Sequence, residues 1–268
     1  MLALKRQIVR TINHPWVGML VRHVYGDRVP SRGLVIDTGV GPCAEAAASR
    51  LWWGLYERAE IDFVCNWLDP NLDVIELGSN IGVVATHIAK KLSRERQLIC
   101  LEANLDLIQT VRANLQRNVP SRKVEVLNLA IYYGSSDHVL FIQEEDSRTS
   151  RILDSTSDNP LEPSSHLSGL ERIVYVPATQ LSTLLKQVNF GDFALVCDIE
   201  GAEAGIILQD CEALQNCRQM IVELHPGSYG EWNCDVEDLR VSLENLGFGV
   251  AQRRGHVYCF TRYSTEEG

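Results

Sequence analysis

The sequence predicts an α/β fold built on a doubly wound, mostly parallel, seven-stranded Rossmann-like sheet. From residue 57 onward, short apolar segments alternate with amphipathic segments of helical period, which is typical of a parallel sheet whose connections are helices. Several apolar segments also end in a carboxylate, and one runs directly into a turn with two glycines. The chain has 268 residues, 45% of them hydrophobic, which is enough for one such domain with its core.

The predicted elements of the first half follow in regular order. They are helix 57–68, strand 72–77, helix 81–92, strand 97–102, helix 105–117, strand 124–129 and an added strand at 139–143. In helix 105–117 the apolar residues Leu105, Ile108, Val111 and Leu115 recur at helical spacing. We therefore expect these four side chains to face the core.

A polar stretch at residues 144–171 interrupts the pattern. It is rich in Ser, Asp, Pro and Glu and too long for an ordinary connection, which predicts a substrate lid or a mobile insertion. The alternation then resumes with strand 172–176, helix 179–188, strand 193–198, helix 203–209, strand 218–224 and helix 235–246. Two short strands at 248–253 and 256–260 flank Arg254-Gly255, which predicts a C-terminal antiparallel hairpin.

Residues 1–55 are predicted to form an N-terminal extension or cap, and residues 56–268 the main domain. Residues 2–25 have the pattern of one or two amphipathic helices, which either pack on the domain or form the contact of a homodimer. Association with a membrane surface is the alternative for these helices. The apolar run at 16–21 is far too short to span a bilayer, so no stable membrane insertion is expected.

The N-terminal extension contains a second strand-like segment with a glycine turn, at residues 34–41, followed by a helical pattern at 44–55. A second cofactor loop would require an apolar strand ending in an acid after this helix. Residues 56–60 are instead amphipathic and helical in pattern. We therefore assign 33–41 to a strand or turn of the cap.

The composition excludes several classes of protein. A net charge of −10 argues against a broad phosphate-binding surface, so nucleic acid is not expected as a substrate. The eight cysteines contain no C-x-x-C pair and no spacing typical of a metal site or a disulfide framework. This pattern predicts a reduced, cytoplasmic setting and no bound metal.

The most informative segment is DVIELGSNIG at residues 73–82. Gly78 lets the chain turn sharply and lets a ligand approach the backbone, and Gly82 is expected to let the next helix pack tightly on the strand. A dinucleotide fingerprint would have glycine where this chain has Asn80. Here the strand carries an acid, Glu76, which suits a ligand with a cationic end. S-adenosylmethionine, with its ammonium and sulfonium groups, has that character.

A second acid stands at the end of the next predicted strand. Glu102 lies 20 residues past Gly82, and a carboxylate at the tip of the second strand can accept both hydroxyls of a ribose. The alternative is that the two glycines form an ordinary strand-to-helix turn and that Glu102 is a solvated strand end.

Polar residues stand at or near the ends of five predicted strands. They are Glu76, Glu102, Asn128, Asp198 and Glu223. Ligands of doubly wound sheets bind at the carboxyl ends of the strands, near the point where the strand order reverses. We therefore expect one crevice to collect these five residues.

The segment DIEGAE, which follows the fourth parallel strand, places three carboxylates within six residues. Asp198, Glu200 and Glu203 can bind a metal, bind the ammonium group of the cofactor, or cap the following helix, since acids favour a helix N-terminus. After the next strand, His225 stands close to an acid. A histidine titrates near neutrality and suits a general base, and the alternative is a hydrogen-bonded structural histidine.

In these motifs the chain resembles the FkbM-type methyltransferases, a branch of the class I S-adenosylmethionine-dependent methyltransferases. The resemblance covers roughly residues 55–225 and is carried by VIELGSNIG, LICLEAN, NLAIYYGSSDHVLF, VYVPATQLSTLL, CDIEGAE and IVELHP, in that order. The family often has proline after the ribose acid, where this chain has Ala103. It often has lysine two residues before the first Asp of CDIEGAE, where this chain has Val196.

The resemblance implies a cofactor site made of the matching residues. The methionine part would be lined by Glu76, Gly78, Asn80 and Gly82, the ribose by Glu102, and the adenine edge by Asn128 to Ala130. Asn104 joins this set, and Asp198 would lie close to the methyl-donor end.

We therefore expect a methyltransferase that methylates a hydroxyl group of a sugar or a specialised metabolite, with a small molecule or saccharide as acceptor. His225, or Asp198 or Glu200 through water, would take the proton. A metal that acidifies the hydroxyl is an alternative mechanism. Two other classes stay open. The first is a protein without catalysis, either a module that binds the cofactor or a nucleotide or a scaffold for partners. The second is a nicotinamide-dependent oxidoreductase, which the missing G-x-G-x-x-G disfavours.

Overall fold

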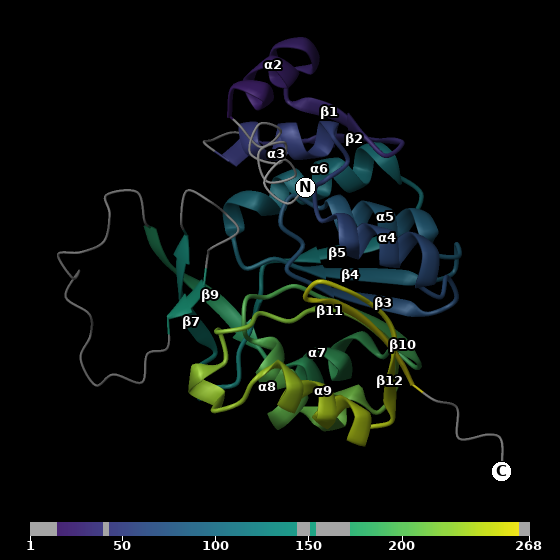
Figure 1. Cartoon of the computed structure of the whole chain (residues 1–268), viewed down its shortest axis with the longest axis vertical. Helices are drawn as coiled ribbons and strands as arrows, with labels where there is room; N and C mark the ends of the chain where they lie inside the picture. The colour runs from purple at the N-terminus through teal and green to yellow at the C-terminus, as the bar shows by residue number, and fades with distance from the viewer. Residues whose placement is uncertain (1–14, 40–42, 144–150, 154–171, 263–268) are drawn as a thin grey trace, which may run out of the picture.

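A seven-stranded sheet forms the centre of the computed structural model, which describes residues 15–39, 43–143, 151–153 and 172–262 (Figure 1). The strand order is β12-β13-β11-β10-β3-β4-β5. The strands are β3 (Asp73–Leu77), β4 (Gln97–Leu101), β5 (Lys123–Leu127), β10 (Phe193–Cys197), β11 (Cys217–Glu223), β12 (Phe248–Arg254) and β13 (Val257–Arg262). The five neighbouring strands β11, β10, β3, β4 and β5 pair in parallel, whereas β13 pairs antiparallel with both β11 and β12. The predicted fold class and the C-terminal hairpin are confirmed.

Helices cover both faces of this sheet (Figure 1). One face carries α4 (Arg58–Trp67), α5 (Val83–Lys91) and α6 (Leu105–Asn118), and the other carries α7 (Leu181–Val188), α8 (Glu203–Gln209) and α9 (Val236–Asn245). Alternate strand residues serve the two faces because successive side chains of a strand point in opposite directions. Val74 and Leu98 belong to the core under α4–α6, and Ile75 and Ile99 to the core over α7–α9.

The predicted core stripe of α6 is correct for three of its four residues. Ile108, Val111 and Leu115 are buried, whereas Leu105 is 61% exposed. Leu105 is the first residue of the helix, so the packed stripe begins one turn later, at Ile108. The helix begins where the side chain of Asn104 accepts a hydrogen bond from the Asp106 N–H at 3.0 Å.

The turn after β3 lies where the strand order reverses, because β3 has β4 on one side and β10 on the other. Gly78 has a φ of 84°, and a Cβ at this position would lie 1.9 Å from the carbonyl oxygen of Asp198. Gly82 was expected to pack α5 on its strand, but its missing Cβ would instead meet Val111 of α6 at 3.1 Å. The two glycines therefore bring the end of β10 and the helix α6 close to the turn.

A second, four-stranded sheet with the order β6-β9-β7-β8 lies beside the central one (Figure 1). Its strands are β6 (Ala130–Ile131), β7 (His138–Gln143), β8 (Arg151–Leu153) and β9 (Arg172–Thr179). The predicted strands at 139–143 and 172–176 are confirmed, and they pair with each other antiparallel. Within the predicted lid, residues 151–153 form β8; the rest of 144–171 lies outside the described residues.

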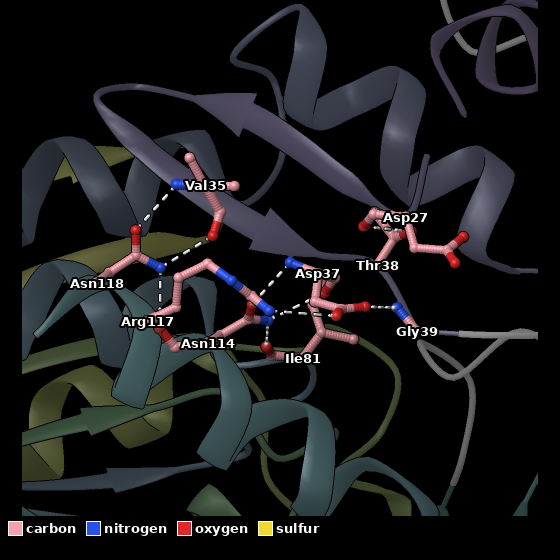
Figure 2. Close-up of polar contacts among 9 residues, drawn as sticks. All are labelled: Asp27, Val35, Asp37, Thr38, Gly39, Ile81, Asn114, Arg117 and Asn118. Atoms are coloured by element: carbon pink, nitrogen blue, oxygen red, sulfur yellow. Dashed lines mark hydrogen bonds and ion pairs between the residues drawn. The ribbon is translucent and has the colours of Figure 1, made fainter. Parts of the chain in front are cut away.

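The described residues of the N-terminal part form α2 (Pro15–Tyr25), a hairpin of β1 (Arg28–Ser31) with β2 (Leu34–Asp37), and α3 (Cys43–Trp52). The segment after residue 33 is thus a strand of this hairpin and not of the central sheet. Figure 2 shows side chains of α6, Asn114 and Asn118, hydrogen-bonded to the main chain of β2. The division of the chain at residue 55 stays a prediction. Among the described residues, no helix combines the length and apolar character needed to cross a membrane.

We expect Gly78→Ala to lower the free energy of unfolding by roughly 2–4 kcal/mol, because it adds a collision with the carbonyl of Asp198 to the strain of a left-handed backbone. Gly26→Ala is the matched control, since Gly26 has a φ of 64° and open space around it. The control should lose only about 1–2 kcal/mol. Equal losses in urea denaturation would contradict the proposed close approach.

Candidate functional site

A cavity of about 650 Å³ opens at the carboxyl ends of the parallel strands. Its volume is in the range of small-molecule sites. The predicted site residues that line it are Gly78, Asn80, Glu102, Asn104, Ala130, Asp198, Glu200, Glu223 and His225. Further lining residues come from α4 and the residues just before it, and from the β12–β13 hairpin: Tyr56, Glu57, Glu60, Arg254 and His256.

Glu102 joins the loop after β3 to the start of α6. One carboxylate oxygen accepts a hydrogen bond from the Asn80 N–H and the other from the Asn104 N–H, each at 2.7 Å. Burial raises the pKa of Glu102 to about 7, although these two hydrogen bonds oppose the shift. Each oxygen keeps a second lone pair, so the carboxylate can still accept a pair of ligand hydroxyls.

Asn80 lines the cavity, and its side chain carries an unsatisfied acceptor. Its φ of 50° is left-handed, a conformation that asparagine tolerates better than most residues. Its Oδ1 is buried and has no hydrogen-bond partner among the described residues. A buried acceptor without a donor is costly, so this atom favours a ligand that carries an N–H or O–H group.

Three predicted cofactor residues do not line the cavity, namely Glu76, Gly82 and Asn128. Glu76 lies behind the loop, where one oxygen accepts from the Ser79 hydroxyl at 2.6 Å and burial raises its pKa to about 7. The Asn128 amide donates to the carbonyls of Glu102 and Ala103, each at 2.9 Å. Both side chains therefore support the loops that form the wall.

One wall of the cavity is acidic. Asp198 and Glu200 follow β10, Glu223 ends β11, and Glu60 reaches the cavity from α4. Burial, together with a hydrogen bond shared with Glu223, raises the pKa of Glu60 to about 8. Sequence reasoning missed Glu60, because an acid on an amphipathic helix is usually solvated, and only the packing of α4 over β11 brings it here.

Glu203 contacts the Nδ1 side of the His225 ring, outside the cavity lining. Its Oε1 lies 2.9 Å from His225 Nδ1 and accepts a hydrogen bond from the Tyr229 hydroxyl at 2.5 Å. Its Oε2 accepts from the Gly201 N–H at 2.8 Å. Glu203 is 1% exposed and does not line the cavity, so it orients the imidazole. Tyr229, which no motif in the sequence indicated, completes this arrangement.

The outer nitrogen of His225 faces two carboxylates. Nε2 lies 3.3 Å from Asp198 Oδ1 and 3.5 Å from Glu200 Oε2. Burial alone would lower the pKa of His225, but hydrogen bonds to Asp198 and Glu203 outweigh it and raise this pKa to about 11. The imidazole is therefore protonated near neutral pH, a state in which it cannot accept a proton.

Glu200 differs from its neighbours in ways that suit proton transfer. Its side chain is 40% exposed, and its backbone has a left-handed φ of 54°. Partial burial raises the pKa of Glu200 to about 7, while the positive charge of His225 acts in the opposite direction. A carboxylate with a pKa near 7 matches the range in which general bases work.

A sequence profile of the Methyltransferase FkbM domain matches residues 76–250. This range begins at the acid of the glycine turn and ends within β12, so it covers more than half of the chain. The chain belongs to the FkbM methyltransferase family. It is accordingly a methyltransferase that uses S-adenosylmethionine as its methyl donor, as the motifs predicted. No curated protein sequence matches the chain significantly.

Solved structures resemble this FkbM methyltransferase at low sequence identity. Magnesium protoporphyrin IX methyltransferase from Synechocystis PCC 6803, with bound cofactor, is 13% identical over 96% of each chain, with a TM-score of 0.46. An O-methyltransferase from Bacillus cereus is 13% identical over 76% of this chain and 78% of the other, with a TM-score of 0.41. A Streptococcus agalactiae protein of the NADB-Rossmann superfamily is 12% identical with a TM-score of 0.41; the match covers 75% of this chain and 65% of that protein. The family assignment depends on the domain match and not on these structures.

We expect Glu102→Ala to weaken the binding of S-adenosylmethionine about tenfold to hundredfold. A charged hydrogen-bond pair contributes about 1.5–3 kcal/mol, and the variant also releases the N–H groups of Asn80 and Asn104. Titration calorimetry measures the effect. Glu95→Ala, which removes a side chain that is 89% exposed, is the control and should bind as the wild type does. An unchanged dissociation constant in Glu102→Ala would show that this carboxylate does not contact the cofactor.

Proposed function

We propose that this FkbM methyltransferase methylates a hydroxyl group of a polar small molecule, such as a sugar or a specialised metabolite, with Glu200 as the general base. The observation that carries the proposal is the acidic wall of the cavity. Its carboxylates accept hydrogen bonds from hydroxyl groups, and one of them has a pKa near 7.

The proposed cofactor placement follows the hydrogen-bonding groups on the wall. Glu102 would accept the two ribose hydroxyls, and the unsatisfied Oδ1 of Asn80 would accept from the ammonium group of the methionine part. The apolar residues Leu129, Ala130 and Ile131 would lie along the adenine.

The negative charge of the site supports a cationic cofactor. One oxygen of Glu76 is buried without a hydrogen-bond partner in the described part of the chain, and the single cation of His225 faces both Asp198 and Glu200. An uncompensated buried carboxylate is unfavourable, and a positive charge nearby relieves it. Asp198 lines the cavity and would therefore stand beside the sulfonium end, with Glu76 acting at longer range from behind the loop.

The cofactor supplies an electrophilic methyl group, and the chain must align the acceptor oxygen with it and remove one proton. Glu200 lies on the acidic wall with part of its side chain open to the cavity, so its carboxylate can take the hydroxyl proton directly or through water. The His225 imidazolium, held by Glu203, keeps positive charge beside Glu200. This favours the ionised form of Glu200 at neutral pH.

The expected role of His225 as the base changes in this proposal. With a pKa near 11, His225 carries a proton at the pH where the enzyme would work. It therefore acts as a fixed cation that positions Asp198 and Glu200, while Glu200 keeps the catalytic role that the sequence suggested for it.

A divalent cation is a second candidate for activating the hydroxyl. Ligand atoms of Asp198, Glu200 and His225 lie within 4.8 Å of one another, a spacing that one metal ion could bridge. The cation would replace the proton of His225 and lower the pKa of the acceptor hydroxyl. In the metal-free mechanism the imidazolium of His225 offsets part of the charge of Asp198 and Glu200, which is the role that the cation would otherwise have.

Transfer of tritiated methyl groups to a panel of sugars and hydroxylated metabolites tests the acceptor class.

We expect Glu200→Gln to lower kcat by about a hundredfold to ten-thousandfold while leaving the affinity for the cofactor nearly unchanged. In the wild type, the deprotonated carboxylate is the active form, so kcat at saturating cofactor should fall as the pH decreases through about 7. Glu200→Gln should lack this acid limb. Glu125→Gln, at an exposed position of β5, is the control.

His225→Asn separates the two roles of the histidine. If His225 acts as a cation, its loss removes the charge that lowers the pKa of Glu200, and the acid limb should move to higher pH with activity regained above it. If His225 is the base, activity should stay low at every pH. Full activity of Glu200→Gln at all pH values would exclude Glu200 as the base.

Chelation distinguishes the metal mechanism from the proposed one. We expect dialysis against a chelator to leave methyl transfer unchanged, because Glu200 takes the proton without a cation. Loss of activity that Mg²⁺ or Mn²⁺ restores would replace the general-base mechanism by activation of the hydroxyl at the metal.

A further inference from the structure

One buried side chain joins the N-terminal hairpin to the glycine loop of the cofactor site. Asn114 of α6 is 0% exposed. Its Oδ1 accepts a hydrogen bond from the Asp37 N–H at 2.6 Å, and its Nδ2 donates to the carbonyls of Asp37 at 3.0 Å and Ile81 at 2.8 Å (Figure 2). The same amide therefore holds β2 and the loop between β3 and α5.

The bond to Ile81 acts on the most constrained part of the loop. Asn80, the preceding residue, has a left-handed φ and donates its N–H to Glu102. The Asn114 bond fixes the carbonyl that follows, so the loop is held on both sides of the strained residue. Without the Asn114 donor, the buried carbonyl of Ile81 would lose this partner, which favours rotation of the backbone next to Asn80.

We propose that Asn114 is a positioning residue for the cofactor, and that it couples docking of the N-terminal hairpin to binding of S-adenosylmethionine. Asn114 does not line the cavity, so it acts only through the loop. Binding and docking then stabilise each other to the same extent, because thermodynamic coupling is reciprocal. The inference depends on the cofactor placement proposed above, and it links the hairpin at residues 28–37 to the cofactor site through Asn114.

The chain provides a matched control one helical turn further along α6. Asn118 accepts from the Val35 N–H and donates to the Val35 carbonyl, each at 2.9 Å. It thus holds the same strand with the same chemistry, and no hydrogen bond of its side chain within the described residues reaches the glycine loop (Figure 2). Asn118→Ala loosens the hairpin alone, whereas Asn114→Ala loosens the hairpin and the loop.

Titration calorimetry with S-adenosylmethionine on the wild type and both variants tests the inference. We expect Asn114→Ala to bind about tenfold more weakly, which corresponds to the loss of one buried hydrogen bond, and Asn118→Ala to bind within about twofold of the wild type. Melting temperatures show whether the two variants lose similar stability. Asn118→Ala should keep its affinity because Asn114 still holds the hairpin and the loop. Equal weakening in both variants would show that the Asn114 bond to Ile81 has no role of its own and would overturn the positioning role, and unchanged binding in Asn114→Ala would overturn the whole proposal.

Hydrogen exchange in the wild type gives a second test that does not require a stable variant. The Asp37 amide, which donates to Asn114, should exchange more slowly when the cofactor is bound. An exchange rate of Asp37 that the cofactor leaves unchanged would overturn the coupling. If the wild type binds no cofactor, the proposed cofactor site and this inference are both wrong. Equal cofactor binding by wild type and Asn114→Ala removes the inference alone.

Discussion

The geometry of the pocket depends on the two main-chain hydrogen bonds that the Glu102 carboxylate receives. They come from Asn80 in the loop after β3 and from Asn104 at the start of α6. The Asn128 amide fixes the carbonyl of Glu102 from the next strand. Three neighbouring strand ends are thus held at one point, and the ligand-facing atoms of the loop have defined positions before any ligand arrives. Such preorganisation reduces the entropy lost on binding.

A concentration of negative charge gives the site its chemistry. Burial raises the pKa of Glu60, Glu76 and Glu102 to about 7 or 8, so these groups are poised between their charged and neutral forms near neutral pH. A cationic cofactor favours the ionised forms and is favoured by them. His225 supplies a fixed positive charge within the same wall. The proposed mechanism thus places the methyl donor and the proton acceptor in one acidic crevice.

Much of this arrangement could be predicted from the sequence. The alternation of elements, the glycine turn and the strand-end acids at Glu102 and Asp198 depend on local patterns, and the structure brings them to one cavity. Other features depend on tertiary packing that no local pattern records. Glu60 joins the acidic wall through the docking of α4, and Tyr229 reaches Glu203 across the turn after β11. The charge of His225 likewise depends on carboxylates that are distant in the sequence.

A crystal structure of the enzyme with S-adenosylhomocysteine tests the central claim most directly. The account predicts both ribose hydroxyls within hydrogen-bond distance of Glu102, with the sulfur facing Asp198 and Glu200. An acceptor hydroxyl bound between the sulfur and the acidic wall would then be close enough to Glu200 for proton transfer. A nucleoside bound away from Glu102, or a sulfur directed away from Asp198 and Glu200, would contradict it.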